Sequence, residues 1–195
     1  MATIERAEWE EFIETVKANV RAHAGYFSWL TDRDVEELGV VQSLHDSLAQ
    51  YGESFFHSYQ LRGRGSDPPD CEAISNSGGR VGLEVTELVD SNSLVAAKVG
   101  RSIPWNAFSQ ETLRHILIER ITKKDDARQV KGGPYDKYIL VVYCDEPRVL
   151  DYHLIEYVRS EHFPKTKLID RAFLLFSYNP REKCCPYIEL KLDGV

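Results

Sequence analysis

A glutamate in the middle of an apolar strand most constrains how this chain can fold. Residues 81–88 read as a strand, and Glu84 lies inside it. An ionised carboxylate among apolar neighbours is costly unless a second charge compensates it. Asp70 is the natural second carboxylate, because the Gly-rich turn at 76–79 folds its strand back alongside Glu84. The cheapest compensation for two such carboxylates is a shared metal cation, so the pair predicts a divalent-metal site.

Length and composition set the outer limits. With 195 residues and 43% hydrophobic content, the chain can bury a core, and we expect one domain over 1–195. The sequence has no apolar run long enough to span a bilayer, and its acidic start lacks the apolar region of a signal peptide. We therefore expect a soluble, cytoplasmic protein with no membrane partner. The net charge of −7 argues against unspecific coating of nucleic acid, but it allows a local basic groove.

The other common catalytic and metal-binding patterns are absent from the sequence. The cysteines show no CxxC spacing, and no two histidines are four residues apart. Neither a nucleophile elbow of the G-x-S-x-G type nor a phosphate-binding P-loop occurs. We expect the cysteines to be buried or half-buried thiols; they are Cys71, Cys144, Cys184 and Cys185.

The hydrophobic periodicity predicts the order of the elements. Helices are expected at 7–24, 31–50, 109–125 and 150–161, and strands at 55–62, 71–75, 80–88, 138–144, 172–178 and 187–192. The second and third strands should form a hairpin, and the continuous apolar run of the fourth is typical of a strand covered on both faces. The predicted fold class is α/β, of the α+β type: one mixed sheet of five or six strands with helices on its faces.

This order of elements resembles the PD-(D/E)xK nucleases, the restriction-endonuclease-like phosphodiesterases. Their common core has a helix with an inward glutamate, strands with PD and ExK-like motifs, an amphipathic helix and another buried strand. The resemblance covers 31–144, to which an N-terminal helix and C-terminal strands are added, and its matched residues are Pro69-Asp70 and Glu84-Val85-Thr86. It implies a Mg²⁺- or Mn²⁺-dependent nuclease, with DNA favoured over RNA as the partner.

The chemistry of phosphodiester hydrolysis explains the carboxylates. The reaction needs a nucleophilic water and stabilisation of extra negative charge on the phosphate, and carboxylate-bound Mg²⁺ supplies both. Asp70 and Glu84 would be direct ligands, with the backbone carbonyl of Val85 as a third. Thr86 stands where the family has its lysine. It shares a strand face with Glu84, but its hydroxyl can only hydrogen-bond.

A cation from another element is therefore needed. Lys124 lies on the apolar stripe of the helix at 109–125, and Lys123 precedes it, so each is a candidate. The alternative is that such a lysine merely extends from the edge of the core to water.

Glu37 is a candidate supporting residue on the helix at 31–50. It shares a helical stripe with Val41 and Leu44, whereas Glu36 is expected to point away. The alternative is an acid placed near the helix start because the helix dipole favours it there.

Two classes of function remain. The first is the metal-dependent nuclease. The second is a catalytically inactive protein of the same fold, acting as a binding or structural module, which Thr86 and the acidic net charge favour. In a simpler interpretation of the motif, Asp70 is a turn residue and Glu84 is salt-bridged to Arg62 or Arg80.

Overall fold

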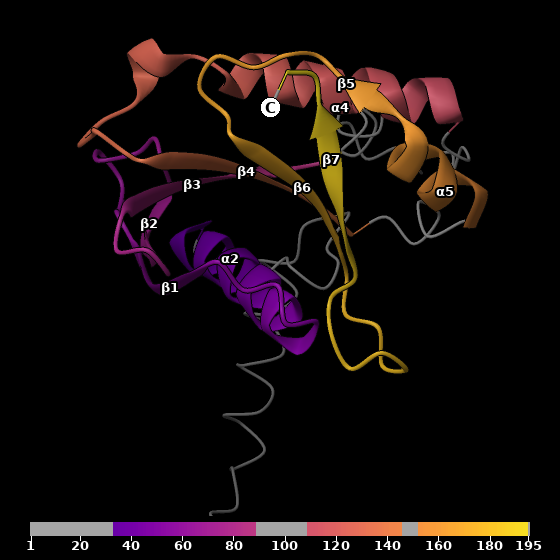
Figure 1. Ribbon diagram of the computed structural model, residues 1–195, viewed down its shortest axis with the longest axis horizontal. Coiled ribbons are helices and arrows are strands. Elements are labelled where there is room, and N and C mark those ends of the chain that lie inside the picture. The colour runs from indigo at the N-terminus through magenta and orange to yellow at the C-terminus, as the bar shows by residue number, and fades with distance from the viewer. Residues whose placement is uncertain (1–32, 89–108, 146–151, 195) are drawn as a thin grey trace, which may run out of the picture.

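The structure is a computed structural model that describes residues 33–88, 109–145 and 152–194. In these ranges three helices lie against one seven-stranded mixed sheet (Figure 1). The helices are α2 (Arg33–Gln50), α4 (Gln110–Lys124) and α5 (Tyr152–Ser160), with a short 3-10 turn at Ala127–Gln129. The strands are β1 (Phe56–Leu61), β2 (Cys71–Ser75), β3 (Arg80–Glu87), β4 (Lys137–Cys144), β5 (His162–Phe163), β6 (Arg171–Phe176) and β7 (Tyr187–Leu192).

The sheet has the order β1-β2-β3-β4-β6-β7-β5. Strands β1, β2 and β3 form an antiparallel meander, and β3, β4 and β6 run parallel. Strand β7 pairs antiparallel with β6 and parallel with β5. The predicted hairpin and mixed sheet are confirmed. The expected count of five or six strands is wrong, because β5 has only two residues, too few to show an alternating pattern.

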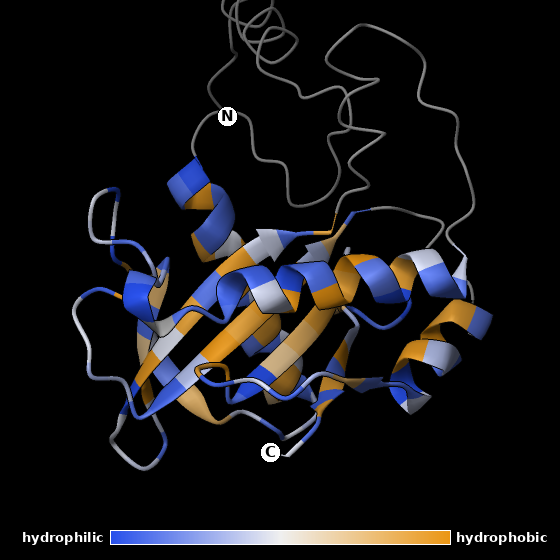
Figure 2. Ribbon diagram, turned by 90° about the horizontal axis from the view of Figure 1, so that it is seen from above, coloured by the Kyte–Doolittle hydropathy of each residue, from blue (hydrophilic) through white to orange (hydrophobic). Residues whose placement is uncertain are grey.

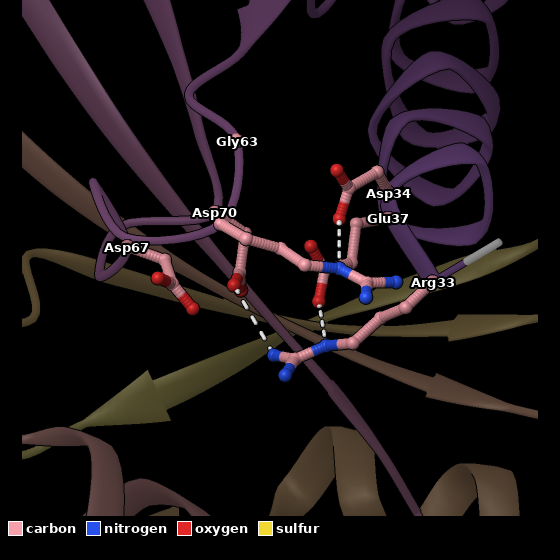
Figure 3. Close-up of a pocket in the computed structure, with 7 residues that line it drawn as sticks. Arg33, Asp34, Glu37, Gly63, Asp67 and Asp70 are labelled. Carbon is pink, nitrogen blue, oxygen red and sulfur yellow. Dashed lines mark hydrogen bonds and ion pairs between the residues drawn. The ribbon is translucent and has the colours of Figure 1, made fainter.

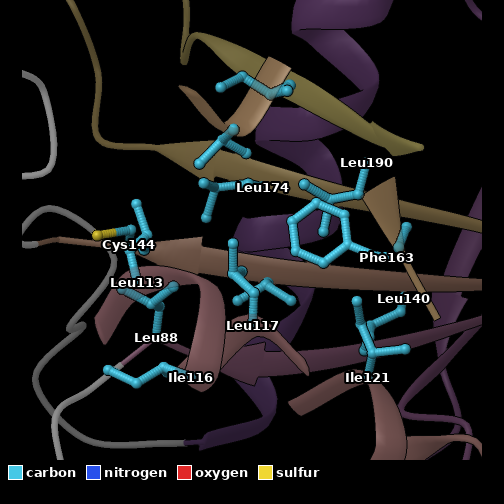
Figure 4. Close-up of a cluster of buried hydrophobic side chains, with 14 of the residues drawn as sticks. Leu88, Leu113, Ile116, Leu117, Ile121, Leu140, Cys144, Phe163, Leu174 and Leu190 are labelled. Atoms are coloured by element: carbon cyan, nitrogen blue, oxygen red, sulfur yellow. The ribbon is translucent and has the colours of Figure 1, made fainter. Parts of the chain in front are cut away.

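The two faces of the sheet carry separate apolar clusters. Helices α4 and α5 cover one face and α2 covers the other (Figure 1). Figure 2 shows that hydrophobic residues dominate the central strands beneath α4. Figure 4 shows the α4 cluster, in which side chains of the helix meet those of β4, β6 and β7. The labelled members of this cluster are Leu88, Leu113, Ile116, Leu117, Ile121, Leu140, Cys144, Phe163, Leu174 and Leu190.

Helix α4 begins and ends as its sequence indicates. The hydroxyl of Ser109 accepts a hydrogen bond of 3.1 Å from the backbone N–H of Thr112, which is the usual role of an N-cap serine. The predicted helix at 109–125 is thus confirmed. The helix expected at 7–24 lies outside the described residues. In the ranges that the structure describes, no helix is both long and apolar enough to cross a membrane.

The orientation of α2 differs in part from the prediction. Val40, Val41 and Leu44 are buried, but so is Glu36, which lies one turn before Val40. The expectation that Glu36 points away is therefore wrong. The reason is that α2 buries the stripe that starts at Glu36 and continues every four residues to Leu48. Val35, in contrast, is 52% exposed.

Strand β3 alternates between the two clusters. Leu83 and Val85 belong to the cluster under α2. Glu84 lies on the opposite face, at the same level of the parallel ladder as Leu140 of the α4 cluster. The carboxylate is thus placed in the layer between the sheet and α4.

Candidate functional site

The structure brings the two predicted carboxylates together. Strands β2 and β3 pair with Cys71 opposite Leu83, so one further step along the register places Asp70 opposite Glu84. Each of the two acidic residues is only 3% exposed. Sequence reasoning found this pair because the turn between the strands fixes their register.

Asp70 stands just before β2, and its carboxylate takes part in the pairing of the strands. Its Oδ2 accepts a hydrogen bond of 2.7 Å from the backbone N–H of Val85. Its Oδ1 lies 3.5 Å from Nη2 of Arg33. Burial and the nearby negative charge of Glu84 raise the pKa of Asp70 to about 7, while the Val85 hydrogen bond opposes the rise. Asp70 is therefore a carboxyl whose ionised form is only partly compensated.

Glu84 has two side-chain partners. Its Oε1 pairs with Nζ of Lys124, and its Oε2 accepts a hydrogen bond of 3.0 Å from the hydroxyl of Tyr138. The expectation of an ion pair with Arg62 or Arg80 is wrong, because both arginines instead lie near Glu72. Arg80 lies at the turn end of the hairpin, opposite Ile74. Arg62 lies at the level of Asp70, but its side chain binds the backbone carbonyl of Lys131 instead.

Tyr138 reaches Glu84 because residue 82 is glycine. Gly82 pairs with Tyr138 in the ladder between β3 and β4, and a Cβ there would lie 3.0 Å from the tyrosine ring and 3.1 Å from Cγ of Pro69. Burial raises the pKa of Tyr138, so its hydroxyl stays protonated and donates. Sequence reasoning missed Tyr138. The available signal was Gly82 itself, since a glycine inside a strand often marks the close approach of another group.

The two candidate lysines differ in position. Lys124 is half-buried, with a side chain that is 25% exposed, and it contacts Glu84. Lys123 is exposed and does not border the site. The proposal of Lys123 as a second candidate is therefore not supported by its position, because a step of one residue along a helix turns the side chain by about 100°.

The end of α4 is tied to a loop that comes much later in the chain. Asp125 follows Lys124 and caps the helix. Its carboxylate accepts hydrogen bonds of 2.7–3.2 Å from three successive backbone N–H groups, those of Lys167, Leu168 and Ile169. Three converging N–H groups form a concave anion site, which here is filled by the protein's own aspartate. This contact anchors the segment that carries Lys124.

Two hollows lie near the carboxylates. The larger, of about 310 Å³, is shown in Figure 3. It is lined by Arg33, Asp34, Glu37, Gly63, Arg64, Asp67 and Asp70. The smaller, of about 200 Å³, is lined by Arg33, Glu36, Glu37, Val85, Thr86, Glu87, Lys124 and Tyr143. Arg33 and Glu37 line both hollows. Of the other predicted residues, Asp70 lines the larger hollow and Thr86 and Lys124 line the smaller, whereas Glu84 lines neither of the two.

Glu37 lines both hollows. Its carboxylate accepts a hydrogen bond of 2.5 Å from Nε of Arg33. Burial raises the pKa of Glu37, the contact with Arg33 opposes the rise, and the charge of Glu84 adds to it. Glu37 thus shares the larger hollow with Asp70 and contacts Arg33. Sequence reasoning missed Arg33, whose position at the site depends on how α2 lies against the sheet.

The donor set was tested for its fit to a divalent cation. In the described ranges no group of three or more His, Cys, Asp or Glu side chains is assembled as a metal site. All four carboxylate oxygens of Asp70 and Glu84 have protein partners, from Arg33, Val85, Lys124 and Tyr138. Nevertheless, the carboxylate oxygens are the hard ligands that Mg²⁺ and Mn²⁺ prefer. Burial, and after it the charges of Glu84 and Glu37, raises the pKa of Asp70, so a further cation would stabilise its ionised form. The residues fit a divalent cation, provided that it displaces a protein cation.

Comparison of the chain with protein-family models, curated proteins and solved structures found no match. Inferences about its function therefore depend on the geometry of the site.

Proposed function

We propose that the chain is a Mg²⁺- or Mn²⁺-dependent phosphodiesterase of the restriction-endonuclease-like type, with DNA as its favoured substrate. The observation that carries this proposal is the placement of two buried carboxylates opposite each other, Asp70 directly before β2 and Glu84 on β3. The order of elements adds support, because this hairpin is followed by α4 and by the parallel strand β4. The PD-(D/E)xK nucleases have the same order.

The residues of the site have separate roles in this proposal. Asp70 and Glu84 hold the metal, together with the backbone carbonyl of Val85. When bound, the ion supplies activation of a water and stabilisation of charge on the phosphate. Lys124 provides the positive charge that Thr86 lacks, since it already contacts Glu84. Thr86 borders the smaller hollow, where its hydroxyl can orient a water.

Glu37 supports the site from α2. Its side chain is only 12% exposed and contacts Arg33, which in turn lies near Asp70. A third carboxylate on the same hollow as Asp70 would bind water on a divalent cation or add to the negative potential that attracts the cation. Glu37 is thus assigned to retention of the metal ion, and Lys124 to stabilisation of negative charge on the phosphate.

A cleavage assay with isosteric variants tests the proposal. Wild-type protein is incubated with double-stranded DNA, single-stranded DNA or RNA, in Mg²⁺ or Mn²⁺ and in chelator. We expect metal-dependent cleavage of DNA, and a loss by a factor of about 100 or more in Asp70→Asn and Glu84→Gln. Glu72→Gln is the matched control, because Glu72 is on the same hairpin but pairs with Arg80. Cleavage that survives both site variants contradicts the proposal.

One observation favours the second class, an inactive protein of the same fold. The carboxylate oxygens of Asp70 and Glu84 are all engaged by protein groups, and position 86 is threonine. In that case the charged cluster would be a structural network within a binding module. Calorimetry discriminates between the two, because a degenerate site binds Mn²⁺ no better than its Glu84→Ala variant.

A further inference from the structure

Arg33 occupies the region between the two hollows. It lies in the first turn of α2, and its guanidinium contacts two carboxylates at once (Figure 3). Nε is 2.5 Å from Oε1 of Glu37, and Nη2 is 3.5 Å from Oδ1 of Asp70. The side chain reaches these groups from solvent, since it is 56% exposed. A positive charge therefore sits beside Asp70 in the protein without metal.

A metal ion at Asp70 and an arginine at Asp70 exclude each other electrostatically. The repulsion between a divalent ion and a guanidinium a few ångströms apart is large in a partly buried site. Arg33 also lies at Oδ1, the oxygen of Asp70 that does not bind the backbone N–H of Val85 and is therefore left for a metal ion. One of the two cations has to leave when the other binds.

We propose that Arg33 is a built-in competitor of the divalent cation: its guanidinium holds the cation's place on Asp70 in the free protein and swings out when the ion binds. The inference rests on the proposed function, because it assigns a regulator to that same metal site. Arg33 lowers the affinity of the site for the metal ion. When no metal is bound, its positive charge reduces the repulsion between Asp70 and Glu37.

The contacts indicate that Arg33, rather than Lys124, is the cation that moves. Lys124 is mostly buried and its partner Glu84 is also held by Tyr138. Arg33 is mostly exposed, and its distance from Asp70 is long for an ion pair. Exposed ion pairs contribute little free energy, so the side chain gives up this contact at small cost.

Titration of the metal alone tests the inference. Calorimetry measures the Kd of Mn²⁺ for the wild type, Arg33→Gln, Arg33→Lys and Arg64→Gln, and circular dichroism verifies that each variant is folded. We expect Arg33→Gln to bind Mn²⁺ about tenfold more tightly. Arg33→Lys keeps the charge and should stay close to the wild type. Arg64→Gln is the matched control, because Arg64 lines the same hollow but pairs with Asp34.

The outcomes separate this inference from the proposed function. If the wild type binds Mn²⁺ and Arg33→Gln binds it equally or more weakly, the inference is wrong and the metal site stands. A similar gain in Mn²⁺ affinity in Arg64→Gln also overturns the inference, because the effect would then reflect net charge alone. Binding by Arg33→Gln but not by the wild type supports it. If no variant binds Mn²⁺, the metal site itself is refuted, and the inference with it.

Discussion

Strands β3 and β4 are neighbours of equal length with very different contents. Each has eight residues, and their parallel ladder pairs Glu84 with Leu140. Strand β4 is apolar on both faces and is buried at every position after Lys137. Strand β3 is apolar toward α2 only, and toward α4 it carries glycine, glutamate and threonine. At equal depth in the sheet, one strand fills the core and the other places polar groups inside it.

This difference shows what a buried charge requires of its surroundings. Leu140 needs only apolar neighbours, which α4 and β6 provide. Glu84 needs a lysine at the end of α4, a tyrosine hydroxyl from β4, and a glycine that makes room for the ring. Natural cores retain such arrangements at a cost in stability, because apolar residues of similar volume are often equally stabilising or better.

Of the paired residues Leu140 and Glu84, the apolar Leu140 should have the largest effect on the free energy of unfolding. Leu140→Ala removes a fully buried side chain from the α4 cluster, and we expect it to lower the free energy of unfolding by about 2–5 kcal/mol. Urea denaturation followed by circular dichroism measures this loss. Val35→Ala is the control, since Val35 is largely exposed, and should change stability by less than about 0.5 kcal/mol. A loss near zero for Leu140→Ala would contradict the equal burial of the two strands.

The charged member should respond to the loss of its partner. Lys124→Met leaves Glu84 buried without a cation, and we expect a cost of about 1–3 kcal/mol in the absence of metal. Lys123→Met is the matched control and should be nearly neutral, because Lys123 is exposed. In a double-mutant cycle, adding Glu84→Gln to Lys124→Met should recover part of the loss. Additive effects would mean that the two groups do not interact.

The smallest expected effect depends on pH and concerns Asp70. Its pKa of about 7 in the folded protein is above the ordinary value of 3.8, so ionisation destabilises the fold as pH rises between these values. Asp70→Asn removes that charge. It should therefore be more stable than the metal-free wild type by about 1–2 kcal/mol near pH 8, and the difference should vanish near pH 4.

Melting curves across this pH range measure the trend, and Glu72 provides a control of opposite sign. Hydrogen bonds from Gln60 and Arg80 lower the pKa of Glu72. Its ionised form therefore stabilises the fold above the ordinary pKa, and that contribution is lost as pH falls through the lowered value. Glu72→Gln should be less stable than the wild type at neutral pH. A rise in melting temperature at neutral pH for Glu72→Gln, or a fall for Asp70→Asn, would contradict the assigned electrostatics.

Much of the fold followed from local patterns. The hairpin of β2 and β3, helix α4 and strand β4 were predicted to within a residue or so, because alternation, helical spacing and an N-cap serine are encoded locally. The convergence of Asp70 and Glu84 followed from the same hairpin. Strand β5 was missed because its pairing with β7 is tertiary and spans only two residues.

The residues missed at the site have a common cause. Tyr138 reaches Glu84 across two strands that are separated in sequence by α4, and Arg33 reaches Asp70 only because α2 lies against the sheet at a particular rotation. Glu36 was misplaced for the same reason. Periodicity tells which stripe of a helix is apolar, but the packing of the whole domain decides which polar residue at its edge is buried.

The contact of Asp125 with the loop ahead of β6 has a consequence for how the site could be altered by variation far away in the chain. The backbone at 167–169 forms a socket for the aspartate, so any change that reshapes the socket shifts the end of α4 and the reach of Lys124. This loop lies about forty residues after Lys124 in the sequence. An insertion there would nevertheless weaken the ion pair between Lys124 and Glu84, as a substitution in α4 would.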